Sequence, residues 1–556
     1  MSTPLWLALA LGPTADPVVA ADFVLVNGKV WTVDPARPQA EAVAVWRGRI
    51  LKVGSDVEIR SLVGPDTKAI DLKGRRVVPG FYDSHVHWLS GGRSLVEVDL
   101  KDAKDEAEFG RRLVAFDQKL PRDRWIVGGN WDHDRTFGGT LPSAATIDRY
   151  VKDRPVFISR YDGHMAVANT TALKLAGVTA ATKDTPGGVV FRLADGKTPS
   201  GVLKDNAMSL VDRLVPEPDE AEILEAVRGA QSLAARVGVT SVQDMDGSSP
   251  RTRRALLRAL QKMARDGSLT CRIDLRWPID RHSDLAGLGA EANFGSDLLR
   301  IGGVKGFMDG SLGSSTAKMF APYLGSQENV GVYVTRPETM RAMIRAADAA
   351  GLNVCVHAIG DEANAVLLDL YEQVAKENGP RDRRFRIEHA QHLRPVDYPR
   401  FKQLGVIASM QPYHVIDDGR WAEGRIGGSR CVSSYAFRSL LDAGANLAFG
   451  SDWPVAPLDP ILGIDAAVNR RTLDGKNPDG WFPLQRITVV EAVEAYTQGS
   501  AFAAGQESDR GSITTGKLAD LVVLSRDILN PAERATIPAI PVDLTVVGGK
   551  VVFERK

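Results

Sequence analysis

Short apolar stretches alternate with longer amphipathic stretches through the middle of the chain, between about residues 79 and 509. The amphipathic kind includes the helical patterns over 340–350 and 363–376. Strands that alternate with helices favour a parallel sheet with crossover helices. Eight apolar stretches have the length of strands, and they end near Ser84, Asp244, Trp277, Phe307, Val356, Glu388, Met410 and Gly450. We therefore expect an α/β fold, a (β/α)₈ TIM barrel.

Both ends of the chain instead show short strands joined by tight turns. Asn27-Gly28, between two apolar runs, is a strong signal for a two-residue hairpin. Apolar runs over 521–524 and 544–547 repeat this pattern near the C-terminus. Neither end has enough strands to close a sheet alone. We therefore expect 23–78 and 510–556 to combine into one small β-sandwich beside the barrel, so that each half covers the other's open edges.

The interval between the first and second predicted barrel strands is far too long for one crossover helix. It runs from about 88 to 236 and contains two further strand-like runs, 125–129 and 155–159. We expect this insertion after strand 1 to form a subdomain that caps the mouth of the barrel.

Charge balance and cysteine content exclude several classes of protein. Lys and Arg number 69, as do Asp and Glu, so the chain lacks the basic surface of a nucleic-acid binder. Three scattered cysteines are too few for a disulfide framework or a thiolate zinc site. Beyond the N-terminal segment, no stretch supplies 18 uninterrupted apolar residues, so we expect no membrane span.

Residues 1–22 have some features of a leader. An apolar run from Leu5 to Gly12 precedes small residues of the kind found at signal cleavage sites. However, no Lys or Arg precedes this run, and Pro13 and Asp16 interrupt the segment. The sequence predicts a periplasmic or secreted protein if this segment is a signal peptide, and a cytoplasmic one otherwise.

Metal-binding residue types gather at the ends of the predicted barrel strands. His85 and His87 end the first strand, and residues two apart in a strand point to the same side. Later strand ends carry Lys305, His357, His389 and Asp452. The C-terminal ends of barrel strands meet at one rim, and imidazole and carboxylate suit Zn²⁺, Mn²⁺ or Fe²⁺. The sequence therefore predicts a divalent metal site of one or two ions, with zinc as the expected metal.

This ordered set resembles the metal centre of the amidohydrolase superfamily. Short motifs extend the likeness to the branch that contains N-substituted formamide deformylases and related uncharacterised metal-dependent hydrolases. They are Asp162-Gly163-His164, Met410-Gln411-Pro412, Gly450-Ser451-Asp452, Ala495-Tyr496-Thr497 and Gly516-Lys517-Leu518-Ala519-Asp520-Leu521. The resemblance covers nearly the whole chain and implies a barrel hydrolase, but the substrates of this branch are diverse.

The resemblance also implies a role for each member of the set. Two metals would be bound by histidines, the more buried metal by His85 and His87 and the more exposed one by His357 and His389. Lys305 would bridge both as an N-carboxylated side chain, because a free ammonium has no lone pair to offer. Asp452 would bind the buried metal and carry a proton from the attacking water to the leaving nitrogen. The metal would lower the pKa of that water to ~7.

Two of these assignments have structural alternatives. Lys305 would otherwise be a lysine of the barrel core or rim that pairs with Asp309. Asp452 would serve as the N-cap of a helix.

Three further residues are candidates for contact with the substrate. His164 ends a strand-like run in the insertion and is a candidate catalytic donor to the substrate carbonyl. Gln411 follows strand seven at the same rim, and Trp131 is a candidate pocket wall. Burial in the core is the alternative for His164 and Trp131.

The sequence thus predicts an enzyme that hydrolyses an amide-type C–N bond of a small molecule, an N-acyl or N-formyl amide. A deaminase or a cyclic-amide hydrolase would use the same centre, and ligand spacing does not separate these activities. A non-catalytic regulatory protein on this barrel would show gaps in the ligand set, and the sequence has none. Oligomeric state stays open, although large barrels of this kind often form homodimers.

Overall fold

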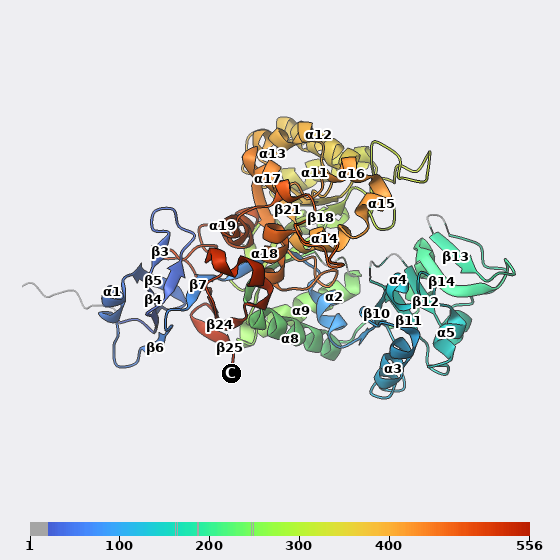
Figure 1. Cartoon of the computed structure of the whole chain (residues 1–556), viewed down its shortest axis with the longest axis horizontal. Helices are drawn as coiled ribbons and strands as arrows, with labels where there is room; N and C mark the ends of the chain where they lie inside the picture. Colours follow the sequence, from blue (N-terminus) through green and yellow to red (C-terminus); the bar gives the residue numbers. More distant parts are fainter. Residues whose placement is uncertain (1–19, 162, 164, 186–187, 246, 248) are drawn as a thin grey trace, which may run out of the picture.

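A computed structural model describes residues 20–556 except 162, 164, 186–187, 246 and 248. Its central element is a sheet of eight parallel strands, which confirms the predicted barrel (Figure 1). In chain order these are β8 (Phe81–Val86), β15 (Val239–Asp244), β16 (Arg272–Pro278), β18 (Leu299–Phe307), β19 (Asn353–Ala358), β20 (Arg386–His389), β21 (Ile407–Met410) and β22 (Asn446–Phe449). Each strand pairs with the next in this order, as crossover connections of one hand require.

The first and last strands of the barrel meet just beyond their ends. Val86 forms a parallel bridge with Trp453, and the backbone N–H of His87 donates to the carbonyl of Trp453 at 2.8 Å. Because both faces of the sheet are covered, every residue of β8 and of β15 is buried, rather than every second one, as in other all-parallel sheets.

Crossover helices surround the sheet. The longer ones are α8 (Glu220–Arg236), α9 (Pro250–Asp266), α11 (Pro337–Ala349), α12 (Asp361–Asn378) and α18 (Pro460–Asn469). The start of α8 is fixed by a capping box, in which Asp219 accepts from the N–H of Glu222 and the Glu222 carboxylate accepts from the N–H of Asp219, both at 2.8 Å. Its buried face packs on α2 (Trp88–Ser94) and α9.

Strands from the two chain ends form the β-sandwich that the sequence predicts. A four-stranded sheet has the order β5-β4-β1-β6, and a six-stranded sheet the order β25-β24-β23-β7-β2-β3. In the second sheet β7 (Arg76–Pro79) pairs antiparallel with β23 (Leu521–Leu524), so residues more than 400 positions apart are hydrogen-bonded neighbours. The remaining strands are β1 (Phe23–Val26), β2 (Lys29–Trp31), β3 (Gln39–Ala40), β4 (Ala42–Trp46), β5 (Arg49–Gly54), β6 (Lys68–Asp71), β24 (Val542–Val547) and β25 (Lys550–Glu554).

The insertion after β8 has a sheet and a core of its own. Its six strands follow the order β13-β14-β12-β11-β10-β9, where the sequence indicated only two. They are β9 (Val98–Asp99), β10 (Gly128–Trp131), β11 (Phe157–Arg160), β12 (Met165–Ala168), β13 (Gly188–Arg192) and β14 (Pro199–Asp205). Of the four additional strands, β9 is too short to show a pattern of period two, and β13 pairs irregularly with β14. Figure 1 shows this sheet on one side of the barrel and the β-sandwich on the other.

Within the described ranges, no helix has the length and apolar character to cross a membrane. The predicted leader, residues 1–22, lies almost wholly outside the described residues. The predicted domain limits at 78, 88, 236 and 509 stay predictions, although α8 packs as a barrel helix rather than with the inserted sheet.

A buried ion pair joins the barrel to the β-sandwich and gives a first testable prediction. The Arg272 guanidinium at the start of β16 donates to both oxygens of Asp520, just before β23, at 2.7 and 2.8 Å. Asp520→Ala would leave a buried, unpaired cation, so we expect the free energy of unfolding to fall by about 3–5 kcal/mol. Chemical denaturation monitored by circular dichroism measures this loss.

The control is Glu372→Ala, which removes an exposed pair with Lys376 and should change stability by less than about 1 kcal/mol. A loss for Asp520→Ala no larger than that of the control would contradict a stabilising role for the interface pair.

Candidate metal centre

The C-terminal ends of the barrel strands surround a cavity of about 280 Å³. Four of the six predicted metal-site residues contribute from strands, whereas His87 follows β8 directly and Asp452 contributes from the turn after β22. The residues of this set that line the cavity are His85, His87, Lys305, His357, His389 and Asp452. The structure therefore brings together every residue that the sequence analysis placed in the metal site.

The carboxylate of Asp452 lies against His85 of β8 and against His87, which follows the end of that strand. Its Oδ1 is 3.3 Å from Nε2 of His85 and 3.2 Å from Nε2 of His87. In a tetrahedral zinc site with Zn–N bonds of about 2.0 Å, neighbouring ligand atoms are about 3.3 Å apart. The spacing of this triad thus fits one divalent metal ion.

A second triad shares the same carboxylate. Ligand atoms of His389, His414 and Asp452 lie within 4.8 Å of one another. Among the described residues, none hydrogen-bonds to two of the buried atoms here, His389 Nδ1 and His414 Nε2. Buried polar atoms without a hydrogen-bond partner are costly, so their presence in this triad also fits a metal ion.

His414 is not among the metal-site residues predicted from the sequence. It lies in the first turn of α14 (Pro412–Asp418), directly after β21, and its ring stacks on that of His389 with centroids 6.4 Å apart. A signal was present, because His414 follows the predicted seventh strand by four residues and could reach the rim from there. Only the helical turn after Pro412 directs the ring back over the barrel.

The orientation of His85 is fixed from behind. Its Nδ1 lies 2.7 Å from Oε2 of Glu388, and the Arg386 guanidinium donates to Oε1 of Glu388 at 2.7 Å. Although burial opposes ionisation, Arg386 and His85 hold the pKa of Glu388 well below its usual range. The anionic Glu388 therefore keeps the proton on Nδ1 and leaves Nε2 free to bind a metal, as carboxylates behind metal-bound histidines do.

Backbone strain marks two of the same residues. His389 and Asp452 have φ angles of 74° and 61°, in the left-handed region that few non-glycine residues adopt. The chain is held there by close packing, since a Cβ on Gly450 would lie only 2.5 Å from the backbone N of His85. Conformations of this kind persist where the surrounding structure determines them, often at functional sites.

Lys305 and His357 lie beside the two triads rather than inside them. The Lys305 amine is 3.4 Å from Nε2 of His85 and is buried, which lowers its pKa. Asp309, its alternative partner, instead accepts from the backbone N–H groups of Ile359 and Gly360. Nε2 of His357 lies 3.0 Å from the carbonyl of Gly310, and burial lowers the pKa of His357 to about 3.

The three residues predicted to contact the substrate are not among the described residues that line the cavity. Gln411 is buried and its amide lies 3.5 Å from the carbonyl of Ser409. Trp131 is fully buried in the core of the inserted sheet and donates to the carbonyl of Ile158 at 2.8 Å. Neither lines the cavity, so the structure favours the packing alternative for Trp131. His164 lies outside the described residues.

The upper walls of the cavity come from segments that the sequence analysis did not assign. Tyr161 contributes from the inserted subdomain, Phe307 from the end of β18, and Trp421 and Asp418 from the region of α14. The insertion also reaches the rim through Lys101, whose amine donates to the carbonyl of Val455 at 3.0 Å. These residues follow no periodic pattern, so only the folded chain identifies them.

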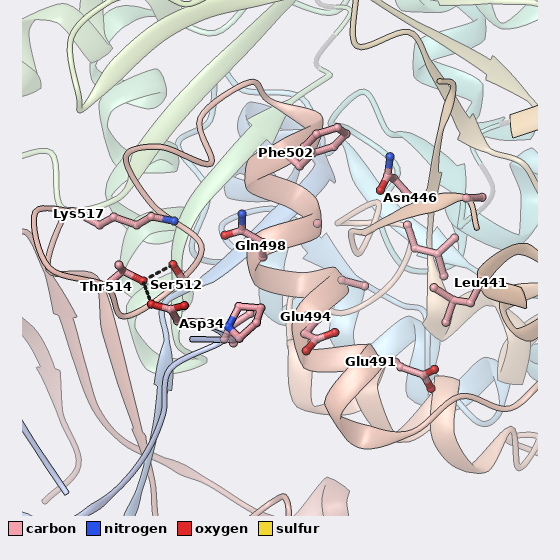
Figure 2. A pocket seen from close by; sticks show the side chains of 16 residues that line it. Asp34, Leu441, Asn446, Glu491, Glu494, Gln498, Phe502, Ser512, Thr514 and Lys517 are labelled. Atoms are coloured by element: carbon pink, nitrogen blue, oxygen red, sulfur yellow. Dashed lines mark hydrogen bonds between the residues drawn. The ribbon is translucent and has the colours of Figure 1, made fainter. Parts of the chain in front are cut away.

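A larger cavity, of about 600 Å³, lies at the opposite end of the barrel (Figure 2). It is bounded by Asn446 at the start of β22, by Gln498 and Phe502, and by Ser512 and Lys517 next to the sandwich. Because barrel active sites lie at the other ends of the strands, and none of the predicted site residues lines this space, the metal centre is the smaller cavity.

Comparison with known proteins agrees with this geometry. The profile of the amidohydrolase family (Amidohydro_3) matches residues 68–553. The chain is 41% identical to Protein LONG AFTER FAR-RED 3 of Arabidopsis thaliana, over 96% of this chain and 92% of that one. It is 29% identical to the N-substituted formamide deformylase of Arthrobacter pascens, over 96% and 98%.

Among solved structures, an uncharacterised metal-dependent hydrolase from Pyrococcus horikoshii OT3 has a TM-score of 0.76 and 31% identity, and the match covers 91% of this chain and 98% of that one. The family match spans most of the sequence, and the fold match likewise extends over most of the chain. The chain therefore belongs to the amidohydrolase family and is a metal-dependent hydrolase that acts on carbon–nitrogen bonds.

Proposed function

We propose that this protein hydrolyses the amide bond of a small N-acyl or N-formyl amide at a zinc centre. The observation that carries the proposal is the single carboxylate of Asp452 shared by two histidine triads. The similarity to the formamide deformylase of Arthrobacter pascens supports the amide as the reacting group. A cavity of about 280 Å³ limits the substrate to a small molecule.

The ligands proposed for the metal are the two triads together with Lys305 and His357, which line the same cavity. Histidine nitrogens and carboxylate oxygens are the ligands that zinc prefers in catalytic sites. A divalent ion bound there would lower the pKa of a coordinated water and polarise the substrate carbonyl.

Asp452 is placed to move the proton of the reaction. It is anionic, because His85 and His389 hold its pKa well below the usual range although burial opposes this. An anionic carboxylate accepts a proton from the attacking water and then returns it to the leaving nitrogen, so that the amide C–N bond breaks to give an acid and an amine. Glu388 holds the ring of His85 in place through its Nδ1, and Nε2 of the same ring contacts the Asp452 carboxylate.

The overall proposal is tested by a hydrolysis screen of metal-reconstituted protein against N-formyl amines, N-acyl amines and lactams. We expect release of free amine from the open-chain amides. Turnover of lactams alone, or of none of these compounds by metal-replete protein, would overturn the proposed substrate class.

His414→Ala gives the second testable prediction. If His414 binds metal, its loss should weaken zinc affinity at least about tenfold, as disturbance of metal ligands and their supports does. Isothermal titration of metal-free protein with zinc measures this. The matched control is His282→Ala, because His282 is bonded to the carbonyl of Ile279 far from the cavity. Unchanged affinity and stoichiometry in His414→Ala would show that the second triad is not a metal site.

A third prediction concerns Lys305, which we propose to be N-carboxylated when two metals are bound. Carboxylation replaces the amine with a carbamate, whose two oxygens can each bind one ion. Electron density of metal-replete crystals should show three additional atoms beyond Nζ. Lys305→Ala should lose metal and activity together, with partial recovery in short-chain carboxylic acids. Density that ends at Nζ with two metals present would contradict the bridging role.

The fourth prediction separates proton transfer from metal binding. Asp452→Asn keeps an oxygen donor of the same size but cannot accept a proton near neutral pH. We expect kcat to fall by roughly 10²–10⁴-fold, with metal content per chain nearly unchanged. His85→Ala should instead lower metal content and activity in parallel. Turnover near the wild-type rate in metal-replete Asp452→Asn would rule out Asp452 as the proton carrier.

A further inference from the structure

One short helix carries both a residue of the metal centre and an acid of the cavity wall. On α14, His414 and Asp418 are four residues apart and both line the cavity. Residues at this spacing lie on the same face of a helix, about 6 Å apart along its axis. A substrate whose reacting group lies at His414 would therefore present its far end to Asp418.

Asp418 is fixed in position by two donors behind it. The Tyr435 hydroxyl donates to its Oδ2 at 2.6 Å, and the Gln391 amide donates to the same oxygen at 2.9 Å. Tyr435 and Gln391 are themselves joined, because the N–H of Tyr435 donates to the Gln391 carbonyl at 2.8 Å. Both supports bind Oδ2, so Oδ1 is left to interact with a ligand.

The supports are in turn anchored in the protein interior. Arg470 is completely buried and donates to the carbonyl of Tyr435 at 3.1 Å. Tyr435 adopts a φ of 51°, a left-handed conformation that is rare for an aromatic residue. Side chains locked by such a second layer hold a binding group within the tolerance that recognition needs.

The charge of Asp418 is not balanced by an ion pair. Its neighbour Asp417 pairs with Arg420, whereas within the described part of the chain Asp418 takes part in no salt bridge. Burial raises the pKa of Asp418 to about 7, because a carboxylate is costly to bury without a cation. Lys305 is the sole Lys or Arg among the described cavity-lining residues, and it lies at the metal end.

Aromatic side chains complete the same region of the cavity. Trp421 lies one turn beyond Asp418, and the backbone N–H of Trp421 donates to the backbone carbonyl of Asp418 at 2.9 Å. Its ring passes over Gly313, since a Cβ there would lie 3.6 Å from the indole. Phe307 and Tyr161 line the remaining walls. A carboxylate among aromatic faces is a combination that attracts organic cations.

We infer that Asp418 selects amide substrates that carry a second, protonated amino group, which its carboxylate would bind about one helical turn from the scissile carbonyl. This inference rests on the proposed amide hydrolysis at the metal centre. The chemical class is a monoacylated diamine or a related amino amide. Asp418 acts as a specificity-determining residue in this scheme, and Tyr435 and Gln391 act as positioning residues.

The test compares substrates of equal size and different charge. N-formyl-1,3-diaminopropane carries an ammonium group where N-butylformamide carries a methyl group. We expect the metal-reconstituted protein to have the higher kcat/KM for the charged amide. Asp418→Asn keeps the hydrogen bonds from Tyr435 and Gln391 but loses the charge. It should reduce the preference roughly 10- to 100-fold, the range for a hydrogen bond to a charged group, mainly through KM.

Asp417→Asn is the matched control, because it removes a neighbouring carboxylate that also lines the cavity but whose charge Arg420 already neutralises. It should leave the preference between the two substrates unchanged. Equal kcat/KM for both substrates in the wild type, or an equal change in Asp418→Asn and Asp417→Asn, would overturn the inference.

A binding measurement keeps this inference separate from the proposed reaction. Titration of the zinc-loaded protein with 1,3-diaminopropane, the product amine, should show binding that weakens at least tenfold in Asp418→Asn. Binding of the diamine without hydrolysis of either amide would overturn amide hydrolysis and support the cation site. Hydrolysis of both amides without Asp418-dependent binding of the diamine would support the reaction and overturn the cation site.

Discussion

Closure of the barrel between β8 and β22 is the interaction on which the metal centre depends. The backbone N–H of Asp452 donates to the carbonyl of His85 at 2.7 Å, and the buried carboxylate of Asp83 accepts from the N–H groups of His85 and Ser451, both at 3.0 Å. These bonds place the first and last strands side by side although they are more than 350 residues apart. A gap here would separate Asp452 from His85 and His87 and leave no shared ligand.

The polar layer beneath the metal centre serves orientation more than stability. Arg386 is completely buried and links β20 to β8, since it donates to Glu388 and to the carbonyl of Ser84 at 2.9 Å. Burial of such a pair costs desolvation energy that its attraction barely repays. The pair of Arg386 and Glu388 instead fixes the tautomer and the orientation of the His85 ring. The same arrangement recurs at Asp418, where buried Arg470 and Tyr435 hold an acid that faces the cavity.

The centre and the cavity walls come from different kinds of structure. Strands of the barrel supply most of the proposed metal ligands, whereas the inserted subdomain, the segment after β18 and the α14 region supply Tyr161, Ser311, Asp418 and Trp421. Barrel enzymes change specificity through such loops while the strand ends keep the chemistry. Membership of the amidohydrolase family therefore fixes the reaction class for this chain, and the walls must decide which substrate fits.

The sequence by itself determined the barrel, the pairing of the chain ends and six residues that line the cavity of the proposed metal site. Period and length reveal buried parallel strands, and a functional residue at a strand end has a predictable place, because all C-terminal ends meet at one rim. It did not determine His414, whose direction depends on the turn at Pro412, or the outcome for Trp131, which resembles a pocket wall in sequence and is core in the structure. Nor did it show Asp418, since nothing local distinguishes this acid from Asp417 next to it. Asp417 pairs with Arg420 only three residues away, whereas tertiary structure surrounds Asp418 with Tyr435 and Gln391, which come from other segments of the chain.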